Sequence, residues 1–237
     1  MPVNLKVTTI GEGKPLVFLH GWGVNSGVWE PLIGILKEHY CIITIDLPGY
    51  GLNQQNIPVS YNLQSIAQLI VSHIPDNSTL IGWSLGGLVA QQIALDFPDK
   101  LTQLVLICSS PKFAKADDWP GIDPKVLGFF MQQLATDFNK TLDRFLAIQA
   151  MGSPCARQDV KVIKQAVKAH PAPAKGALIA GLEMLNTVDL RSQIKSLKVP
   201  CCLFLGRLDT LVPEELKVVF GQLAPQIEVR VLNNVSH

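Results

Sequence analysis

Short apolar runs alternate with longer segments of helical period through the first 110 residues. The runs are apolar at successive positions, which is typical of parallel strands that have helices on both faces of the sheet. They lie at residues 15–21, 41–49, 78–84 and 101–110. The helical segments lie at residues 28–39, 61–74 and 85–97. This alternation predicts βαβ units on a mostly parallel central sheet flanked by helices.

The pattern changes after residue 110, where helical segments follow one another without strands as far as residue 189. The alternation then resumes with a strand, a helix and a strand, at residues 201–209, 213–224 and 228–234. We therefore predict one α/β core made of residues 1–110 and 190–237. A helical lid of residues 111–189 interrupts this core.

The composition is typical of a soluble globular protein, because 48% of the 237 residues are apolar and 16% are charged. The net charge of +1 favours neither nucleic acid nor an anionic membrane as a partner of the whole molecule. Residues 1–10 lack the apolar core of a signal peptide, which predicts a cytoplasmic protein, and we expect a monomer. The five cysteines show no CxxC spacing, so we expect reduced thiols and no metal site.

Residues 82–86, Gly-Trp-Ser-Leu-Gly, fit the G-x-S-x-G pattern of a nucleophile elbow. In an elbow a strand turns sharply into a helix, and the tight backbone around an exposed serine needs glycine on both sides. A strand-like run precedes Ser84 and a helical segment follows it, so the serine stands at a helix N-terminus, whose dipole favours developing negative charge. The alternative is a glycine-rich turn with a capping serine.

A serine nucleophile needs a base, which is itself oriented by a carboxylate. Asp209 follows the run at 201–206, at the end of a strand where the active sites of open α/β sheets form. His237 follows the next strand through a short loop. These positions predict a triad of Ser84, Asp209 and His237. Asp46 precedes the nucleophile and Asp189 lies in the lid, so both fit the acid's role less well.

Residues 20–23, His-Gly-Trp-Gly, follow the first strand, where this type of fold places one oxyanion-hole amide. We expect the main-chain N–H groups of Trp22 and Leu85 to be the donors. His20 is expected to fix this loop by hydrogen bonding.

The same loop has a competing interpretation as a dinucleotide-binding turn, since Gly21 and Gly23 follow a strand and Asp46 ends the next one. Ser26 occupies the position of the third glycine, however. This interpretation also leaves the predicted triad unexplained.

Several segments along the whole chain together resemble the α/β-hydrolase superfamily, namely HGWG, DLPGYG, GWSLGGLVA and GRLDTLVP. Others, including FLAIQAMGSPCARQD and LEMLNTVDLR in the lid, are similar to the BioH family, the pimeloyl-[acyl-carrier protein] methyl ester esterases of biotin synthesis. The resemblance implies an α/β-hydrolase fold and hydrolysis of the methyl ester that masks the pimeloyl carboxylate, with release of methanol. It implies no metal or organic cofactor.

The resemblance also implies roles for individual residues. Ser84 would be the nucleophile, Asp209 the orienting acid and His237 the base, while Trp22 and Leu85 would line the oxyanion site and contact the ester. The substrate-contacting segment of the lid would consist of Phe145, Leu146, Ala147, Ile148 and Gln149. The residues alone leave open whether this stretch contacts substrate or packs the lid onto the sheet. Trp83 and Phe129 are further candidates for the walls of an acyl channel.

The lid carries a local excess of positive charge, with seven basic and two acidic residues between residues 139 and 175. Four-residue spacing lets each helix present its cations on one side. The resemblance implies that four of them hold an acidic acyl-carrier protein: Lys140, Arg144, Arg157 and Lys161. The alternative is a solvated helix face without a partner.

The sequence ends at His237, whereas the family continues with a loop and a final helix. We expect the loss of that anchor, and a carboxylate beside the imidazole, to alter the position and the pKa of His237. Two other functions stay open at this point. One is a broader carboxylesterase of the same fold, and the other is a non-catalytic binding protein that resembles a hydrolase.

Overall fold

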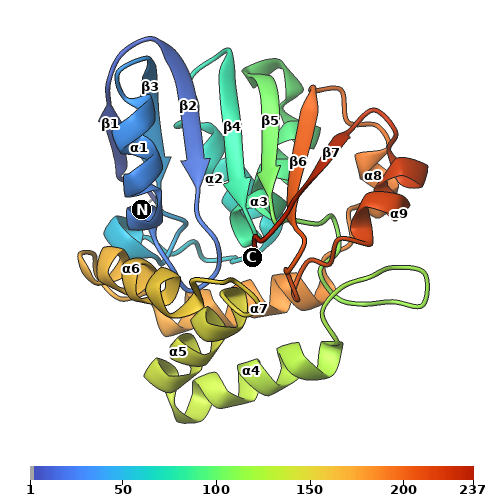
Figure 1. Ribbon diagram of the computed structural model, residues 1–237. Helices are drawn as coiled ribbons and strands as arrows, with labels where there is room; N and C mark the ends of the chain where they lie inside the picture. The colour runs from blue at the N-terminus through green and yellow to red at the C-terminus, as the bar shows by residue number, and fades with distance from the viewer. Residues whose placement is uncertain (1–2) are drawn as a thin grey trace.

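The computed structural model describes residues 3–237 and contains a seven-stranded sheet with helices on both faces (Figure 1). The strands are β1 (Val7–Ile10), β2 (Lys14–Leu19), β3 (Tyr40–Ile45), β4 (Ser78–Trp83), β5 (Leu101–Ile107), β6 (Cys201–Gly206) and β7 (Glu228–Leu232). Their order in the sheet is β1-β3-β2-β4-β5-β6-β7. Only β1 is antiparallel to its neighbour, so the predicted mostly parallel sheet is confirmed.

The helices of the core connect these strands and are short. They are α1 (Glu30–Leu36), α2 (Leu63–Val71), α3 (Leu85–Asp96), α8 (Arg191–Ile194) and α9 (Leu216–Leu223). Single turns of 3-10 helix cover Ser26–Trp29, Gly51–Asn53 and Pro98–Lys100. Asn62 caps α2, because its side chain accepts the N–H of Ser65.

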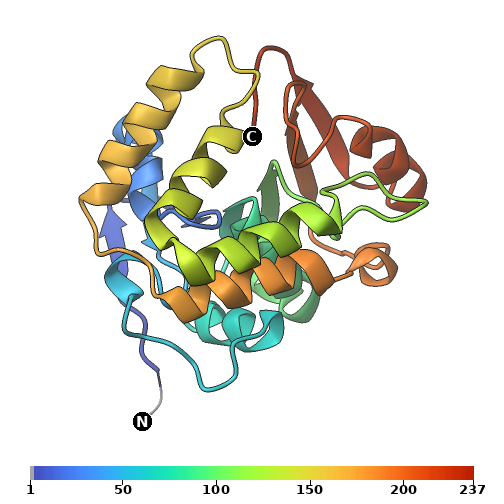
Figure 2. The same ribbon diagram turned by 90° about the horizontal axis from the view of Figure 1, so that it is seen from below.

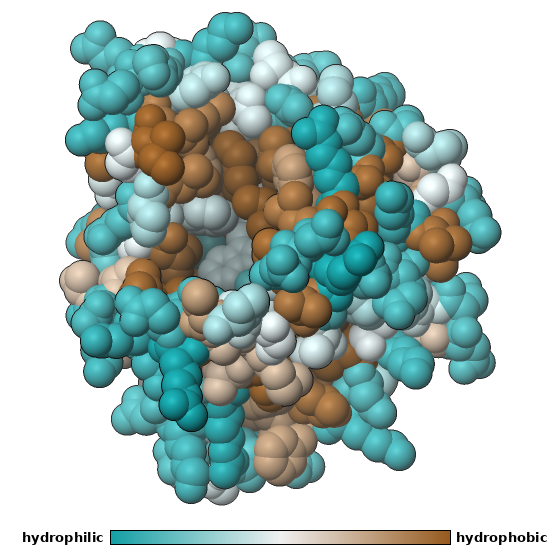
Figure 3. Space-filling model, viewed as in Figure 1, coloured by the Kyte–Doolittle hydropathy of each residue, from teal (hydrophilic) through white to brown (hydrophobic). Residues whose placement is uncertain are grey.

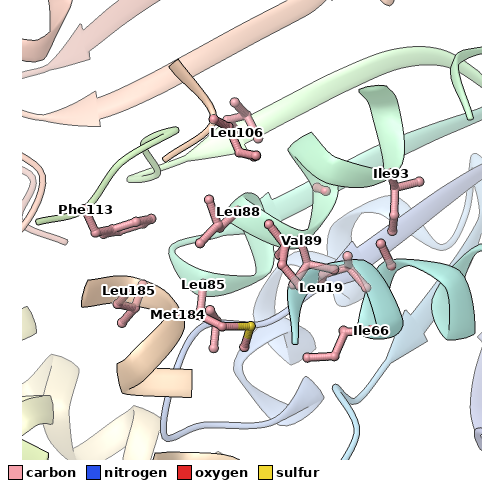
Figure 4. Packing of buried hydrophobic residues seen from close by; sticks show 14 of the residues in the cluster. Leu19, Ile66, Leu85, Leu88, Val89, Ile93, Leu106, Phe113, Met184 and Leu185 are labelled. Atoms are coloured by element: carbon pink, nitrogen blue, oxygen red, sulfur yellow. The ribbon is translucent and has the colours of Figure 1, made fainter. Parts of the chain in front are cut away.

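Helix α3 lies at the centre of the molecule and is buried on nearly every side. Its side chains Leu85, Leu88 and Val89 pack between the sheet and the neighbouring helices, against residues such as Leu19 and Leu106 of the strands (Figure 4). A helix that is apolar all round needs cover on all sides. The sheet, α2 and α8 provide that cover, together with residues such as Met184 and Leu185 from the segment 111–189.

Residues 111–189, all of which the structure describes, contribute four helices and no strand to the sheet. These helices are α4 (Pro124–Thr136), α5 (Phe138–Gln149), α6 (Ala156–Lys168) and α7 (Lys175–Thr187). They lie across the carboxyl ends of the strands, with α4 and α7 side by side (Figures 1 and 2). Helices α4 and α5 are separated by Asp137, whose side chain accepts the N–H of Lys140 and caps the start of α5.

No helix within residues 3–237 combines the length and the apolar character needed to cross a membrane.

Candidate active site

A sharp turn joins β4 to α3 at Ser84. The backbone of Ser84 has a φ of 54° and a ψ of −119°, which non-glycine residues rarely adopt. A Cβ at Gly82 would lie 2.6 Å from the carbonyl oxygen of Gly86, and one at Gly86 would lie 2.4 Å from the carbonyl oxygen of Leu19. Both glycines are therefore required by the packing. The turn places the Ser84 side chain at the N-terminus of α3.

Three side chains from distant parts of the chain meet at this turn. Nε2 of His237 lies 2.8 Å from Oγ of Ser84, and Nδ1 of His237 lies 2.8 Å from Oδ2 of Asp209. The other carboxylate oxygen of Asp209, Oδ1, accepts the N–H groups of Leu211 and Val212 at 2.8 and 2.9 Å. Because an ionised carboxylate only accepts hydrogen bonds, Nδ1 carries the proton and donates to Asp209, which leaves the lone pair of Nε2 for the serine hydroxyl. The arrangement matches that of a nucleophile, a base and an orienting acid.

His237 is held by its main chain as well as by its ring. Its N–H donates to the carbonyl of Gln149, at the end of α5, across 3.0 Å. The C-terminus accordingly lies beside that end of α5 in Figure 2. The ring packs against Trp83 with 5.9 Å between centroids, and the side chain is only 1% exposed. The ring is therefore held within hydrogen-bonding distance of both Ser84 and Asp209.

The loop after β2 lies directly against the nucleophile turn. A Cβ at Gly21 would lie 3.2 Å from the Cβ of Ser84. Trp22 is fully buried, and its indole N–H donates to the carbonyl of Leu178 in α7 at 2.8 Å, which ties the loop to the lid. Leu85 is the first residue of α3, so its N–H has no acceptor within the helix. Trp22 lies in the loop that meets the nucleophile turn and Leu85 directly follows the serine, so their main-chain amides stay the candidate oxyanion donors.

His20 fixes this loop as a neutral ring. Its Nδ1 atom lies 2.8 Å from the carbonyl of Gly21, to which it donates, and its Nε2 atom accepts the N–H of Leu47 at 3.0 Å. Burial lowers the pKa of His20, which keeps the ring uncharged. A base would need a free lone pair beside the serine, so His20 has a structural role here.

Asp46 follows β3 and joins the same loop to the next one. Its two carboxylate oxygens accept the N–H groups of Ser26 and Leu52 at 2.6 and 2.8 Å. The carboxylate is buried, and the backbone of Gly51 packs so closely that a Cβ there would lie 2.3 Å from it. Both carboxylate oxygens are thus engaged within the protein, unlike those of an acid that binds a ribose. The dinucleotide-binding interpretation is therefore wrong.

Comparison with known proteins agrees with this geometry. The family model of the alpha/beta hydrolase fold matches residues 14–237. A pimeloyl-[acyl-carrier protein] methyl ester esterase from Pseudoalteromonas atlantica is 49% identical over this whole chain, which covers 92% of that protein. The enzyme of the same name from Vibrio cholerae is 47% identical over 96% of this chain and 88% of that protein. The chain belongs to the α/β-hydrolase family and, within it, to the pimeloyl-[acyl-carrier protein] methyl ester esterase family.

Solved structures share the fold of this chain. An esterase from Exiguobacterium antarcticum superposes with a TM-score of 0.87 at 24% identity, over 98% of this chain and 88% of that one. The fold class expected from the sequence is confirmed.

The lid segment that we expected to contact substrate has both inward and outward positions in this α/β hydrolase. Phe145 is buried, and its ring lies 4.5 Å from that of Trp22. Leu146 is also buried, whereas Ala147 is exposed and Ile148 is half-buried. Apolar side chains gather around a hollow near the carboxyl ends of the strands (Figure 3). Only part of the segment therefore faces the inside of the molecule.

Gln149 and Phe129 complete the lid residues named from the sequence. Gln149 is 2% exposed, and neither atom of its side-chain amide has a hydrogen-bond partner among the described residues. A buried primary amide of this kind needs a partner that is not part of the chain, such as a substrate or a water molecule. Phe129 is 48% exposed and lines a surface groove between α4 and α5 together with Arg144.

The four basic residues expected to hold a carrier protein are exposed on α5 and α6. They are Lys140, Arg144, Arg157 and Lys161. The guanidinium of Arg144 also donates to the side chain of Gln133 at 3.2 Å. The neighbouring Lys164 pairs with Asp143 at 2.7 Å, so it adds less positive charge to this face than its place in the sequence suggested.

Asp189, the other acidic candidate, takes no part in the site. It forms ion pairs with Arg191 and Lys112 at the surface, at 2.8 and 3.2 Å. The hydrogen bond from Arg191 lowers the pKa of Asp189 to about 2.

The sequence reasoning missed two neighbours of His237. One is the main-chain carbonyl of Gln149, which accepts the N–H of His237. The other is Cys108, whose sulfur lies close to both Asp209 and His237. Cys108 belongs to no motif, and the lid segment that contains Gln149 gives no sign of a contact with His237. Both are brought to the site by tertiary packing, so no local signal pointed to them.

Proposed function

We propose that this protein hydrolyses the methyl ester of pimeloyl-[acyl-carrier protein], releasing methanol and the free carboxylate on its carrier. The observation that carries the proposal is the continuous hydrogen-bonded chain from Ser84 through His237 to Asp209. It supplies the chemistry of ester hydrolysis. The relatives, named as enzymes for this ester, supply the substrate.

In the first half of the reaction, Ser84 Oγ attacks the ester carbonyl while Nε2 of His237 takes its proton. The negative carboxylate of Asp209, 2.8 Å from Nδ1, stabilises the imidazolium that forms. The main-chain N–H groups of Trp22 and Leu85 donate to the carbonyl oxygen as it becomes negative. Collapse of the tetrahedral intermediate expels the methoxy group, which receives the proton from His237 and leaves as methanol.

In the second half, water attacks the acyl group on Ser84 with His237 again acting as the base. The collapse of the second intermediate returns the proton to Ser84 and frees the carboxylate.

Gln149 lies next to this chemistry, because its main-chain carbonyl accepts the N–H of His237 while its side-chain amide has no partner among the described residues. We assign this amide to binding of the substrate. Among the described residues of the segment 145–149, only Gln149 has a buried polar side chain without a hydrogen-bond partner.

The lid has a second role in this proposal, which is to recognise the carrier. Residues 111–189 act as the lid on a core of residues 1–110 and 190–237. The exposed cations of α5 and α6 bind the acidic surface of the acyl-carrier protein. We propose that the enzyme works as a cytoplasmic monomer.

The test compares two substrates with the same protein. Pimeloyl-carrier protein methyl ester and a short nitrophenyl ester are each offered to the wild type and to Ser84→Ala. We expect a higher kcat/KM for the carrier-protein ester, and no turnover of either ester by the variant. Complementation of a biotin-requiring strain that lacks this esterase provides the cellular test.

Two outcomes contradict the proposal in different ways. Fast cleavage of the short ester, without any advantage for the carrier-protein ester, identifies a broader carboxylesterase. A Ser84 that does not react with an organophosphonate identifies a non-catalytic binding protein.

A further inference from the structure

The side chain of Cys108 lies beside the acid and the base of the site, where the proposed mechanism gives it no task. Cys108 directly follows β5, and its N–H donates to the carbonyl of Phe204 in β6 at 2.8 Å. Its sulfur lies 3.7 Å from the carbonyl of Ser236, next to the catalytic candidate His237. One ligand atom each from Cys108, Asp209 and His237 lie within 4.8 Å of one another.

Sulfur, imidazole nitrogen and carboxylate oxygen are the three donor types that Zn²⁺ takes in proteins, at about 2.3, 2.0 and 2.1 Å. Donors around one tetrahedral ion lie roughly 3.5 Å apart, so the three side chains need only small shifts to bind the same ion. A thiolate among the ligands favours soft or borderline ions over Mg²⁺ and Ca²⁺. We propose that Cys108, Asp209 and His237 form an inhibitory site for a thiophilic divalent cation such as Zn²⁺ or Cd²⁺.

Binding changes which nitrogen of His237 carries a proton. In the free site Nδ1–H donates to Asp209, and Nε2 faces Ser84 Oγ at 2.8 Å. The ion occupies the lone pair of Nδ1, so the imidazole proton moves to Nε2, while the thiol proton of Cys108 passes to water. Nε2–H then donates toward Ser84 and cannot accept its proton. The ion thereby blocks the step that activates the nucleophile.

The surroundings of Cys108 also limit the affinity of the site. Burial and the nearby carboxylate of Asp209 raise the pKa of the Cys108 thiol. The ion must displace this proton, so binding is weaker than at a site with preformed thiolates. All three side chains are buried, and we expect binding to develop slowly after mixing.

Titration with Cd²⁺, followed by the ultraviolet absorption of the cadmium–thiolate bond, tests the site without relying on the proposed function. Cys155 is exposed, so the experiment uses Cys155→Ala to remove that competing thiol. We expect one Cd²⁺ to bind per chain. The affinity should fall about 100-fold or more when Cys108→Ser is added, and about tenfold or more when Asp209→Asn is added instead.

Inhibition is the second readout and does rest on the proposed function. With a short ester as substrate, we expect Zn²⁺ to inhibit the Cys155→Ala protein, and EDTA to restore its activity. The half-inhibiting concentration should rise about 100-fold in Cys108→Ser, with each protein compared with its own metal-free rate. The site is overturned if the cadmium–thiolate absorption does not appear in the Cys155→Ala protein, or if it persists when Cys108→Ser is added to that protein. If the protein binds the metal as expected but has no esterase activity, the proposed function is refuted and the metal site stands.

Discussion

The main-chain N–H of His237 donates to the carbonyl oxygen of Gln149 across 3.0 Å. This bond connects the residue that carries the candidate base to the last turn of α5. Helix α5 therefore helps to hold the imidazole in line with Ser84 and Asp209. A shift of α5 would move a hydrogen-bonded ring whose contacts to both partners are 2.8 Å long.

The side chain of Gln149 leads to a first prediction. Gln149→Leu keeps the volume and removes a buried amide that has no partner. If that amide serves the substrate, kcat/KM should fall about tenfold, while the melting temperature stays the same or rises because an unsatisfied polar group is gone. Steady-state kinetics and thermal unfolding of the same preparation measure both effects.

Gln91→Leu is the matched control for stability. The amide nitrogen of Gln91 donates to Gly87, Ser109 and Ser110 at 3.1–3.4 Å, although its amide oxygen has no partner among the described residues. Gln91→Leu therefore removes hydrogen bonds that Gln149→Leu does not. We expect this variant to unfold at a lower temperature than the wild type. A Gln149→Leu protein with lowered stability and full activity would show that the amide is a packing group.

A second prediction concerns the nucleophile. Ser84→Ala should lower the rate of ester hydrolysis about 10³-fold or more, because the attacking oxygen is removed. It should also abolish labelling by an organophosphonate, as measured by the mass of the intact protein. Ser109→Ala is the control, since the hydroxyl of Ser109 donates to the main-chain carbonyl of Ser84 at 2.9 Å and accepts from Gln91 at 3.4 Å, but does not take part in the triad. Labelling that survives in Ser84→Ala would place the nucleophile elsewhere.

The third prediction separates two aspartates. Asp209→Asn should lower kcat by about 10³ to 10⁴, because the amide no longer stabilises the imidazolium or fixes the ring as its Nδ1–H form. Asp189→Asn removes a surface ion pair with Arg191 and should change kcat less than twofold. The two kcat values, measured on a short ester, decide the assignment. A reversed order would transfer the orienting role to the lid.

Much of the fold and of the candidate site could be predicted because it depends on local patterns. The strand before Ser84, the glycines on both sides and the helix after it are adjacent in sequence, and the packing around Gly82 and Gly86 requires that pattern. Strand β1 was missed, because four residues at an antiparallel edge carry little apolar signal. The break between α4 and α5 at Asp137 has no clear signal either, since apolar spacing continues through it.

Contacts between distant segments could not be predicted in this way. The bond between His237 and Gln149 joins residues whose sequences show no sign of pairing. The approach of Cys108 to Asp209 likewise depends on the register between β5 and β6. In the lid, the pairing of Lys164 with Asp143 changed a charge pattern that the sequence alone showed as continuous.

The fourth prediction uses the lowered pKa of His20, which burial causes. In the unfolded chain this histidine takes up a proton below about pH 6.5, whereas in the folded protein it stays neutral to lower pH. The unfolded state thus binds more protons in this range, so His20 makes the protein less stable as pH falls below about 6.5. The melting temperature of His20→Gln should therefore depend less on pH between 7 and 5 than that of the wild type. Parallel curves for the two proteins would mean that His20 does not titrate in this window.

The last prediction concerns the exposed cations of the lid. Reversing Arg144 and Arg157 to Glu should lower kcat/KM for the carrier-protein ester, because charges at the rim of an interface mainly affect the rate of encounter. The loss should shrink as salt is raised from about 0.02 to 0.5 M, since salt screens exposed charges. Hydrolysis of a short ester should stay within about twofold of the wild type, because neither side chain touches the triad.

Lys14→Glu is the control for this charge reversal. Lys14 is exposed at the start of β2, at the opposite end of the sheet from the lid. The Lys14→Glu substitution changes the total charge without altering the face formed by α5 and α6. It should therefore leave the preference for the carrier-protein ester nearly unchanged. Equal losses on both esters in the Arg144 and Arg157 variant would indicate a damaged lid. No loss on either ester would mean that these cations only contact solvent, and the carrier protein would then have to bind elsewhere.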